Sequence, residues 1–529
     1  MRNKNHGLQS LTLLLLLFSA HIGFGQGASS QIEIVNADVF QGDETIGKGV
    51  SLLKGNVAFK HRGALMYCDS AYLYQQSNSL DAFGQVRINQ GDTLRLNGDT
   101  LRYNGNSGIA VITGKVTLID RKMNLSSPKL TYDMPADKAY YLEGGILKDN
   151  ENTLTSRKGY YYSKQSKVFF SDSVLLLNPK YNVEADSLSY LTKKSTAIFT
   201  GPTRIVSTGS DSTWIYCENG YYDTKLSKSR FYKPNRVVSR SRSLSGDTLD
   251  FDNATRVGTA KGRVTIADTA QSVIISGDKG FSDDRSRTAL VTGNAELMRV
   301  FNQDTLFLHA DTLYAREDTL SGIAAWVAFR GVRFFKSDLQ GKCDSLSYTT
   351  PDSIMKMHVD PVLWNDSNQV TADFIQMRIN NDGPQSMQLE SAAFICAQQD
   401  SSRFNQISGK RMDGFFTDGR LVSVDVFGNG QSIYYTADSN GNLTGVNSAE
   451  CSDMLIKLDG NKVSNITLIN DPDATLYPMY DLSPSDLLLK GFKWLEADRP
   501  KDRMDIFRRA VNTSTLHGFH FNTFHQSGT

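Results

Sequence analysis

The 529-residue chain has little proline, few cysteines and no excess of charge of either sign. It contains 12 Pro against 42 Gly, and 57 Lys and Arg residues against 56 Asp and Glu residues, for a formal net charge of +1. This balance argues against a nucleic-acid-binding protein, which normally carries a basic excess or stripe. It also argues against an acidic disordered protein. Because 40% of the residues are hydrophobic and 22 Tyr and 27 Phe accompany the few prolines, the composition favours a large core built from β-structure.

Motifs that mark enzymes and metal sites are missing as well. The sequence has no Gly-x-Ser-x-Gly, no His-Glu-x-x-His and no Gly-Gly-x-Gly-x-Asp calcium repeat. The His residues at 61, 309 and 358 stand far apart in the sequence, so we interpret them as structural or surface residues. We therefore expect no catalytic residues, no metal site and no cofactor.

The first 26 residues have the three-part form of a secretory signal peptide. Basic residues precede an apolar run at 11–18, and Gly23 and Gly25 supply small residues before an expected cleavage next to Gln26. The apolar run is too short for the ~20 residues that span a bilayer. No Cys stands at the expected cleavage point, and no later stretch approaches a membrane-spanning helix. We therefore expect an exported chain without a lipid anchor.

A sequence element of about 30 residues recurs eleven times. In the clearer copies its anchor is an Asp followed by an apolar and an aromatic residue, as in Gly-Asp-Thr-Leu-Arg-Tyr at 98–103. Weaker copies begin at 128, 157, 218 and 373, and successive anchor positions from 69 to 373 are 29 to 33 residues apart. We expect the anchor Asp to form an Asx-type turn at the start of a strand. The second half, as in Ala-Val-Ile-Thr-Gly-Lys-Val-Thr-Leu at 110–118, predicts a strand, a small turn residue and a second alternating strand. Such a tandem array predicts a solenoid-like stack of β-layers.

The repeat also suggests a role for the cysteines. Cys68, Cys217 and Cys343 occupy the same slot of different repeats, several layers apart. A disulfide needs Cα atoms within about 7 Å, so we expect these three to be small buried residues that do not pair with each other. A bond between Cys396 and Cys451 stays open.

The end of the chain departs from the repeat. We assign residues 31–400 to the repeats, 401–475 to a closing β-segment, and 476–529 to a C-terminal helix and a disordered tail. Apolar residues such as Leu487 and Trp494, bounded by Pro484 and Pro500, predict the short helix.

The alternation of Gly-Asn/Lys-Val-x-Leu strands with Ala/Gly-Asp-x-Leu-x-Tyr anchors resembles the OstA/LptA-like family of lipopolysaccharide-transport proteins. The resemblance covers residues 45–395 and is carried by segments 54–59, 98–103, 113–116 and 276–278. It implies an all-β fold, an elongated open β-jellyroll of stacked antiparallel strands, secreted to the periplasm. In that family, which includes the amino-terminal domain of LptD, an apolar interior carries the acyl chains of lipid A. Because this chain is much longer than a single bridge protein, an extended bridge and an accessory jellyroll both stay open.

The interior positions that would contact lipid are the valine slot after each small turn and the residue two beyond it. An ordinary closed core is the alternative for the same residues, because sequence alone does not separate a groove from a filled interior. The ten positions are Val57, Phe59, Val86, Ile88, Val116, Leu118, Val174, Leu176, Val264 and Ile266.

The sequence therefore predicts a periplasmic lipid-binding module that shields lipopolysaccharide acyl chains between the inner and outer membranes. Expected partners are lipopolysaccharide or lipid A, and other OstA/LptA-like jellyrolls that pair at edge strands. Self-association and a peripheral position at the outer membrane are further options, and nucleic acid is not expected. Two other classes stay open: a secreted β-helix carbohydrate-active enzyme and a purely structural envelope scaffold.

Overall fold

The computed structural model describes residues 31–508 except 43–44, 46, 92–93, 121–122, 150, 211, 302–303, 319–321, 351, 381–382, 460–461 and 480. The chain divides into two compact units, residues 1–149 (unit 1) and 150–529 (unit 2), and each is described by itself. The expected signal peptide and the expected disordered tail lie outside the described residues. Within the described ranges, no helix is long and apolar enough to cross a membrane.

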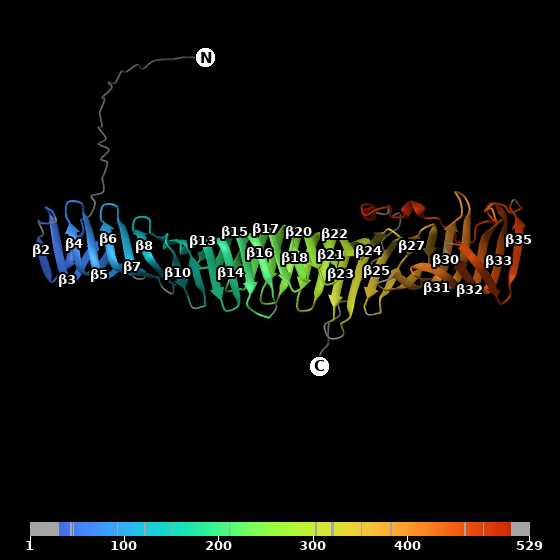
Figure 1. Cartoon of the computed structure of the whole chain (residues 1–529), viewed down its shortest axis with the longest axis horizontal. Helices are drawn as coiled ribbons and strands as arrows, with labels where there is room; N and C mark the ends of the chain where they lie inside the picture. The colour runs from blue at the N-terminus through green and yellow to red at the C-terminus, as the bar shows by residue number, and fades with distance from the viewer. Residues whose placement is uncertain are drawn as a thin grey trace, which may run out of the picture. The chain divides into compact units, whose positions relative to one another are not determined.

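Unit 1 is built from antiparallel strands, coloured blue to cyan in Figure 1. Strands β3 to β8 each pair with the next strand of the chain, and both β1 and β2 pair with β3. The strands are β1 (Glu33–Asn36), β2 (Val39–Gly42), β3 (Val50–His61), β4 (Ala64–Tyr74), β5 (Ser79–Gln90), β6 (Leu94–Asn104), β7 (Ile109–Asp120), β8 (Met123–Asp133), β9 (Lys138–Tyr141) and β10 (Gly145–Lys148).

Unit 2 repeats the same plan with more strands, followed by two short 3-10 helices (Figure 1). Its residues 401–475 continue the antiparallel pairing through β31 to β35. The elements are β11 (Thr153–Ser156), β12 (Lys158–Tyr162), β13 (Lys167–Asn178), β14 (Tyr181–Leu191), β15 (Thr196–Ser207), β16 (Trp214–Asp223), β17 (Lys228–Ser239), β18 (Arg242–Ser245), β19 (Thr248–Asp252), β20 (Val257–Asp268), β21 (Val273–Asp283), β22 (Thr288–Val300), β23 (Thr305–Glu317), β24 (Ala324–Lys336), β25 (Leu339–Thr349), β26 (Ile354–His358), β27 (Val362–Asn365), β28 (Asn368–Thr371), β29 (Phe374–Asn380), β30 (Gly383–Gln398), β31 (Phe404–Thr417), β32 (Arg420–Ala437), β33 (Leu443–Asp459), β34 (Lys462–Ile469), β35 (Asp473–Pro478), η1 (Glu496–Asp498) and η2 (Asp505–Phe507).

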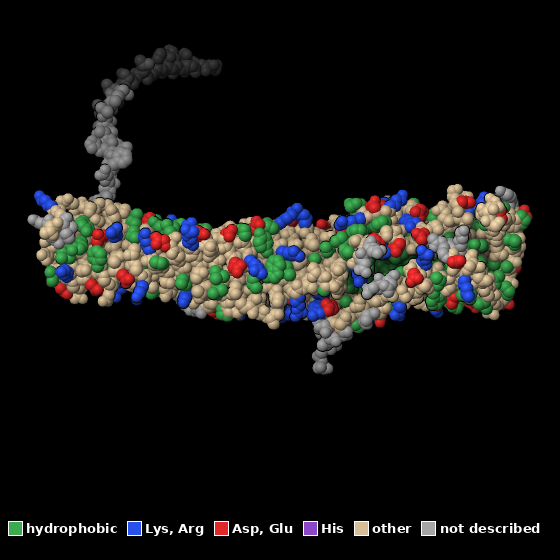
Figure 2. Space-filling model, in the orientation of Figure 1, with side chains coloured by type: hydrophobic (Ala, Val, Ile, Leu, Met, Phe, Trp, Pro, Cys, Tyr) green, Lys and Arg blue, Asp and Glu red, His purple; other side chains and the backbone are tan. Residues whose placement is uncertain are grey.

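The strands form because apolar residues alternate with polar ones. In β5, Leu80, Ala82, Val86 and Ile88 are buried, while most residues between them are half-buried or exposed. Successive side chains of a strand point to opposite faces, so each strand contributes one apolar face to the interior. On the face of unit 2 seen in Figure 2, Lys and Arg side chains are interspersed with Asp and Glu. The prediction of an all-β fold of stacked antiparallel strands is confirmed.

A two-residue bulge interrupts many strands near their middle. In β7, Gly114 and Lys115 have φ angles of +77° and +40°, and the register with β8 breaks between Thr113 and Val116. The second half of each repeat is therefore one long bulged strand, and the expectation of two short strands around a turn is wrong. Extra residues of this kind bend a strand, which lets the sheet fold over.

The anchor Asp lies opposite the bulge and not at the start of a strand, so the expected Asx-type turn is also wrong. Asp99 is in the middle of β6, beside the bulge of β7. A Cβ atom placed on Gly114 would lie only 2.3 Å from Asp99 Oδ2 and 2.8 Å from Asp99 Cβ. Glycine is required because the position combines a positive φ with this close approach. The same contact joins Asp69 to Gly84.

In unit 1 the sheet folds back on itself. His61 ends β3 and is three strand pairings away from the start of β6, whereas Tyr103 is at the other end of β6. In a flat sheet the nine residues from Leu94 to Tyr103 would separate these side chains by roughly 30 Å. Instead, His61 Nδ1 is 2.5 Å from the Tyr103 hydroxyl. The two rows of hairpin turns therefore meet, and we call the line where they meet the seam.

Unit 2 has a seam of the same kind. Tyr181 begins β14 and Tyr222 is the last residue but one of β16, yet their ring centroids are 5.3 Å apart in an edge-to-face arrangement. We call the turns that follow the bulged strands, such as 239–242, the first edge. The turns that precede the bulged strands, such as 252–257, form the second edge.

Beyond β35, residues 482–508 form an irregular segment of turns and two 3-10 helices, which we call the C-terminal strap (red in Figure 1). It runs back along the outer face of unit 2. In β30 both Phe394 and its neighbour Ile395 are buried, although alternation places them on opposite faces. The ring of Phe394 lies 6.2 Å from that of Phe492 in the strap, so the strap covers the outer face.

Buried glutamines hold the strap. Gln406 Oε1 accepts a hydrogen bond from the backbone N–H of Leu489 at 2.9 Å, and Gln369 Oε1 accepts one from Leu495 at 2.7 Å. Farther along, Arg503 Nε donates to Glu296 at 2.6 Å. Within residues 482–508 only η1 and η2 are helical, each with three residues, so the expected C-terminal helix is wrong. Side chains of the sheet satisfy the strap's backbone in place of helical hydrogen bonds.

Candidate functional site

All ten sequence-predicted interior residues are buried, with exposed fractions from 0% to 6%. In unit 1, Val57, Val86 and Val116 each follow the bulge of their strand, so they form one inward row with Phe59, Ile88 and Leu118 beside them. In unit 2, Val174 and Leu176 lie on β13, and Val264 and Ile266 lie on β20. The structure thus brings each set to the interior of its own unit. Their contact with lipid stays a prediction.

The interior around these residues is closely packed in unit 1. Leu53, Met66 and Leu80 are each at most 1% exposed, and they fill the space between the two folded halves of the sheet. Burial of this extent is typical of an ordinary protein core.

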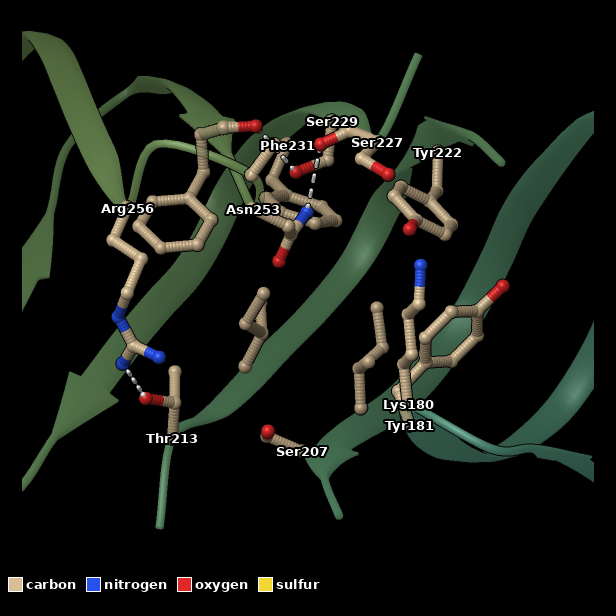
Figure 3. Close-up of a pocket in the computed structure, with 14 residues that line it drawn as sticks. Lys180, Tyr181, Ser207, Thr213, Tyr222, Ser227, Ser229, Phe231, Asn253 and Arg256 are labelled. Atoms are coloured by element: carbon tan, nitrogen blue, oxygen red, sulfur yellow. Dashed lines mark hydrogen bonds between the residues drawn. The ribbon is translucent and has the colours of Figure 1, made fainter. Parts of the chain in front are cut away.

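The seam of unit 2 opens into a cavity of about 270 Å³ (Figure 3). Its floor is apolar and comes from inward-facing residues of β15, β16, β17 and β19, whereas its rim is polar and comes from both edges of the seam. The floor residues are Ile205, Ile215, Phe231 and Phe251, and the remaining lining residues are Lys180, Tyr181, Ser207, Thr213, Tyr222, Ser227, Ser229, Asn253, Ala254 and Arg256.

Hydrogen bonds within the second edge fix one side of the rim. Ser229 Oγ donates to the carbonyl of Phe251 at 3.1 Å, and Asn253 Nδ2 donates to the carbonyl of Ser227 at 3.3 Å (Figure 3). Burial raises the pKa of the Tyr222 phenol above its ordinary value, so that side chain stays neutral. Among the lining residues the cations are Lys180 and Arg256, and the Nη2 atom of Arg256 lies 3.0 Å from the Asp284 carboxylate. The arrangement suits an apolar chain that carries an anionic group at one end.

Only weak signals in the sequence point to this cavity. Around it, the bulges of β13, β15 and β17 fall at Asp172-Ser173, Gly201-Pro202 and Lys233-Pro234 in place of the usual Gly-x pair before valine. The change of bulge sequence in these three strands distinguishes the strands around the cavity from the other repeats. The rim residues themselves stand at strand ends, where the repeat pattern imposes no residue type.

The five cysteines are free and buried, so Cys396 and Cys451 do not pair in this structure. None of the groups of His, Cys, Asp and Glu in the described part of the chain is placed to hold a metal ion. Burial raises the pKa of Cys68 to about 11 and the pKa of Cys217 to about 12.

We therefore expect the thiols of the native protein to resist Ellman's reagent at about pH 8, near the ordinary thiol pKa of ~8.5, because a thiolate is needed for the reaction. All five should react once urea unfolds the chain. The measurement is the absorbance of the released thiolate dye with and without urea. Rapid reaction of most thiols in the folded protein would contradict this burial.

Comparison with known proteins agrees with this architecture. Residues 29–186 match the family of OstA-like proteins. Residues 274–382 match the family described as LptA/(LptD N-terminal domain) LPS transport protein. Among curated proteins, none matches the chain.

One similar solved structure is the crystal structure of LptH, the LptA homologous periplasmic component of the conserved lipopolysaccharide transport device from Pseudomonas aeruginosa. It is 16% identical over 19% of this chain and 76% of that chain, with a TM-score of 0.18.

The folded antiparallel sheet is that of a β-jellyroll. Over the two matched segments the chain is similar to the OstA/LptA-like family. The matched families are transport proteins and not enzymes.

Proposed function

We propose that this chain is a periplasmic component of lipopolysaccharide transport that shields lipid acyl chains from water. The observation that carries the proposal is the cavity of unit 2, where the seam opens onto an apolar floor beneath a cationic rim. Lipopolysaccharide combines acyl chains with anionic groups, which fits both parts of this site. The families matched on either side of the cavity, at 29–186 and 274–382, support the same substrate class.

The energetics favour a sheltered path. Burying an acyl chain contributes about 0.8 kcal/mol per CH₂, so exposing several chains to water costs tens of kcal/mol. At about 30 Å³ of liquid volume per water, a cavity of about 270 Å³ has room for about nine waters. This volume suits part of one acyl chain and not a whole lipid molecule. The remaining interior, including the ten predicted positions, would receive lipid as the seam parts.

The free strand edges support the proposed partners. In unit 1, β1 and β2 pair only with β3 among the described strands, and Val35 and Phe40 on them are 55% and 57% exposed. In unit 2, β34 and β35 pair with β33, and Leu476 on β35 is 62% exposed. Such edges can accept a further strand. The proposed occupants are other OstA/LptA-like jellyrolls or a second copy of this chain.

The other two classes have less support. A β-helix enzyme is built from parallel coils, whereas the strand pairs described for each unit are antiparallel. A structural scaffold has no need for a cavity with an apolar floor and a cationic rim. Periplasmic location and peripheral contact with the outer membrane belong to the transport proposal.

Filling the mouth of the cavity tests the proposal. Ser207 lines the cavity, and the neighbouring Thr208 is exposed and lies outside it. We expect Ser207→Trp to weaken binding of fluorescent lipid A about tenfold, or about 1.4 kcal/mol, because the indole takes the space of the acyl chain. Thr208→Trp is the matched control and should bind as the unchanged protein does. Equal binding by both variants, measured by fluorescence anisotropy, would count against the cavity as the lipid site.

A further inference from the structure

A polar clasp closes the seam directly beside the cavity. Arg256, at the cavity rim, donates from Nε to Asp284 Oδ2 at 3.1 Å, and its Nη2 atom is 3.0 Å from the same oxygen. Nη2 also donates to Thr213 Oγ1 at 2.5 Å (Figure 3) and to Ser239 Oγ at 3.3 Å. Ser239 Oγ in turn donates to Asp284 Oδ2 at 2.9 Å. We call these four residues the Arg256 clasp.

The clasp joins the two edges of the seam. Arg256 and Asp284 belong to the second edge, in the turns before β20 and β22. Thr213 and Ser239 belong to the first edge, at the start of β16 and the end of β17. While the Arg256 clasp is closed, it holds the first edge at β16 and β17 to the second edge at the turns before β20 and β22.

A second ionic group continues the closure beyond the clasp. Arg242 of the first edge donates to Glu317 of the second edge at 3.0 Å and to Asp268 at 3.0 Å. Arg287 also bonds to Glu317. The Arg256 clasp therefore lies between the cavity and a stretch of the seam that ion pairs hold closed.

The clasp is built so that an anion can exchange into it. The side chains of Arg256 and Asp284 are 19% and 23% exposed, so solvent and ligands reach both. A guanidinium binds phosphate oxygens with paired hydrogen bonds of the same kind that it makes to a carboxylate. An acyl chain on the apolar floor would hold a phosphate close to the guanidinium and raise its effective concentration there.

Resting on the proposed function, we propose that Arg256 is the gate of the seam. The phosphate of a lipid headgroup replaces Asp284 on its guanidinium. The exchange withdraws the guanidinium from Thr213 and Ser239, and the two edges part. The same event that recognises the anionic lipid thus opens the interior between β17 and β23 to its acyl chains.

Distances across the seam test the gate in the full chain. Spin labels at Ala270→Cys on the first edge and Thr255→Cys on the second edge both occupy exposed positions, and the native thiols are buried. We expect lipid A to lengthen the label-to-label distance. Dephosphorylated lipid A should bind without lengthening it, and inorganic phosphate alone should leave it unchanged.

Two substitutions separate the gate from simple binding. Arg256→Gln should remove the preference for phosphorylated over dephosphorylated lipid A, which we expect to be about tenfold in affinity. Asp284→Asn should increase the affinity for phosphorylated lipid A, because the competing carboxylate is gone. Arg230→Gln is the matched control, because Arg230 forms an equivalent pair with Asp250 at 2.5 Å, 44% and 39% exposed, away from the cavity lining.

The outcomes are distinguishable. A phosphate preference that survives in Arg256→Gln, or an opening caused equally by dephosphorylated lipid or by inorganic phosphate, overturns the gate and leaves lipid binding standing. Failure of both lipids to bind the unchanged protein overturns the proposed function itself. If Arg256→Gln fails to fold, the distance measurement on the unchanged clasp and the Asp284→Asn affinity still decide the question.

Discussion

Replacing Gly114 with Ala is expected to destabilise unit 1 by about 2–5 kcal/mol. A side chain at its φ of +77° costs about 1–2 kcal/mol. The new Cβ would also lie 2.8 Å from the Asp99 Cβ, a contact that rotation of the Asp side chain does not relieve, and such overpacking costs about 1–3 kcal/mol more. Hydrogen exchange of peptides from β6 to β8 in the full chain measures the effect, because all four Trp residues lie in unit 2.

Gly63→Ala supplies the matched control. Gly63 has a φ of +76°, and a Cβ placed there meets no atom within 4 Å, so only the backbone cost of about 1–2 kcal/mol should appear. In a double-mutant cycle, Asp99→Gly, which removes the Cβ of that residue, should relieve part of the Gly114→Ala cost, with a coupling of about 1 kcal/mol or more. Equal losses of folding stability from Gly63→Ala and Gly114→Ala, with no coupling energy between positions 114 and 99, would show that the contact between the anchor Asp and the bulge does not shape the strand.

The repeat could be predicted from the sequence because its determinants are local. The alternation of Val116 and Leu118 with polar neighbours is decided within one strand, and all ten interior positions chosen from it are buried. The pairing of an anchor Asp with a bulge glycine also recurs in the sequence, as in Asp69 with Gly84 and Asp99 with Gly114. The sequence predicted an Asx-type turn at the anchor Asp and not a contact with the bulge, because an Asp beside small residues is equally typical of a turn.

The seam contacts could not be predicted in the same way. Arg256 and Thr213 are 43 residues apart, and Arg242 and Glu317 are 75 residues apart. No local periodicity links such pairs, because they meet only after the bulges have folded the sheet. The cavity lies among these contacts, so its rim residues were missed together with the clasp.

The strap shows tertiary contacts overriding a local pattern. The apolar residues between Pro484 and Pro500 suggested a helix, but Phe492 and Trp494 pack on Phe404 with ring centroids 5.1 Å and 4.8 Å away. The backbone of the strap is then satisfied by Gln406 and Gln369. Apolar burial on both faces of β30 was the available signal: four consecutive buried residues replace the usual alternation at 393–396.

Photo-crosslinking to lipopolysaccharide in cells tests the central claim that the apolar interior carries acyl chains. Phe231 lies on the cavity floor and is fully buried, whereas its neighbour Tyr232 faces outward and is 45% exposed. Benzoylphenylalanine is close in shape to both residues, so the two positions differ mainly in the face of β17 that they report. The same comparison between Leu118, which is fully buried, and the outward-facing Thr117 extends the test to unit 1.

We expect lipopolysaccharide adducts from benzoylphenylalanine at 231 and none above background at 232, with adducts at 118 and not at 117 if acyl chains also enter unit 1. Adducts at 232 equal to those at 231, or an interior that yields no adduct in cells actively exporting lipopolysaccharide, would contradict the account.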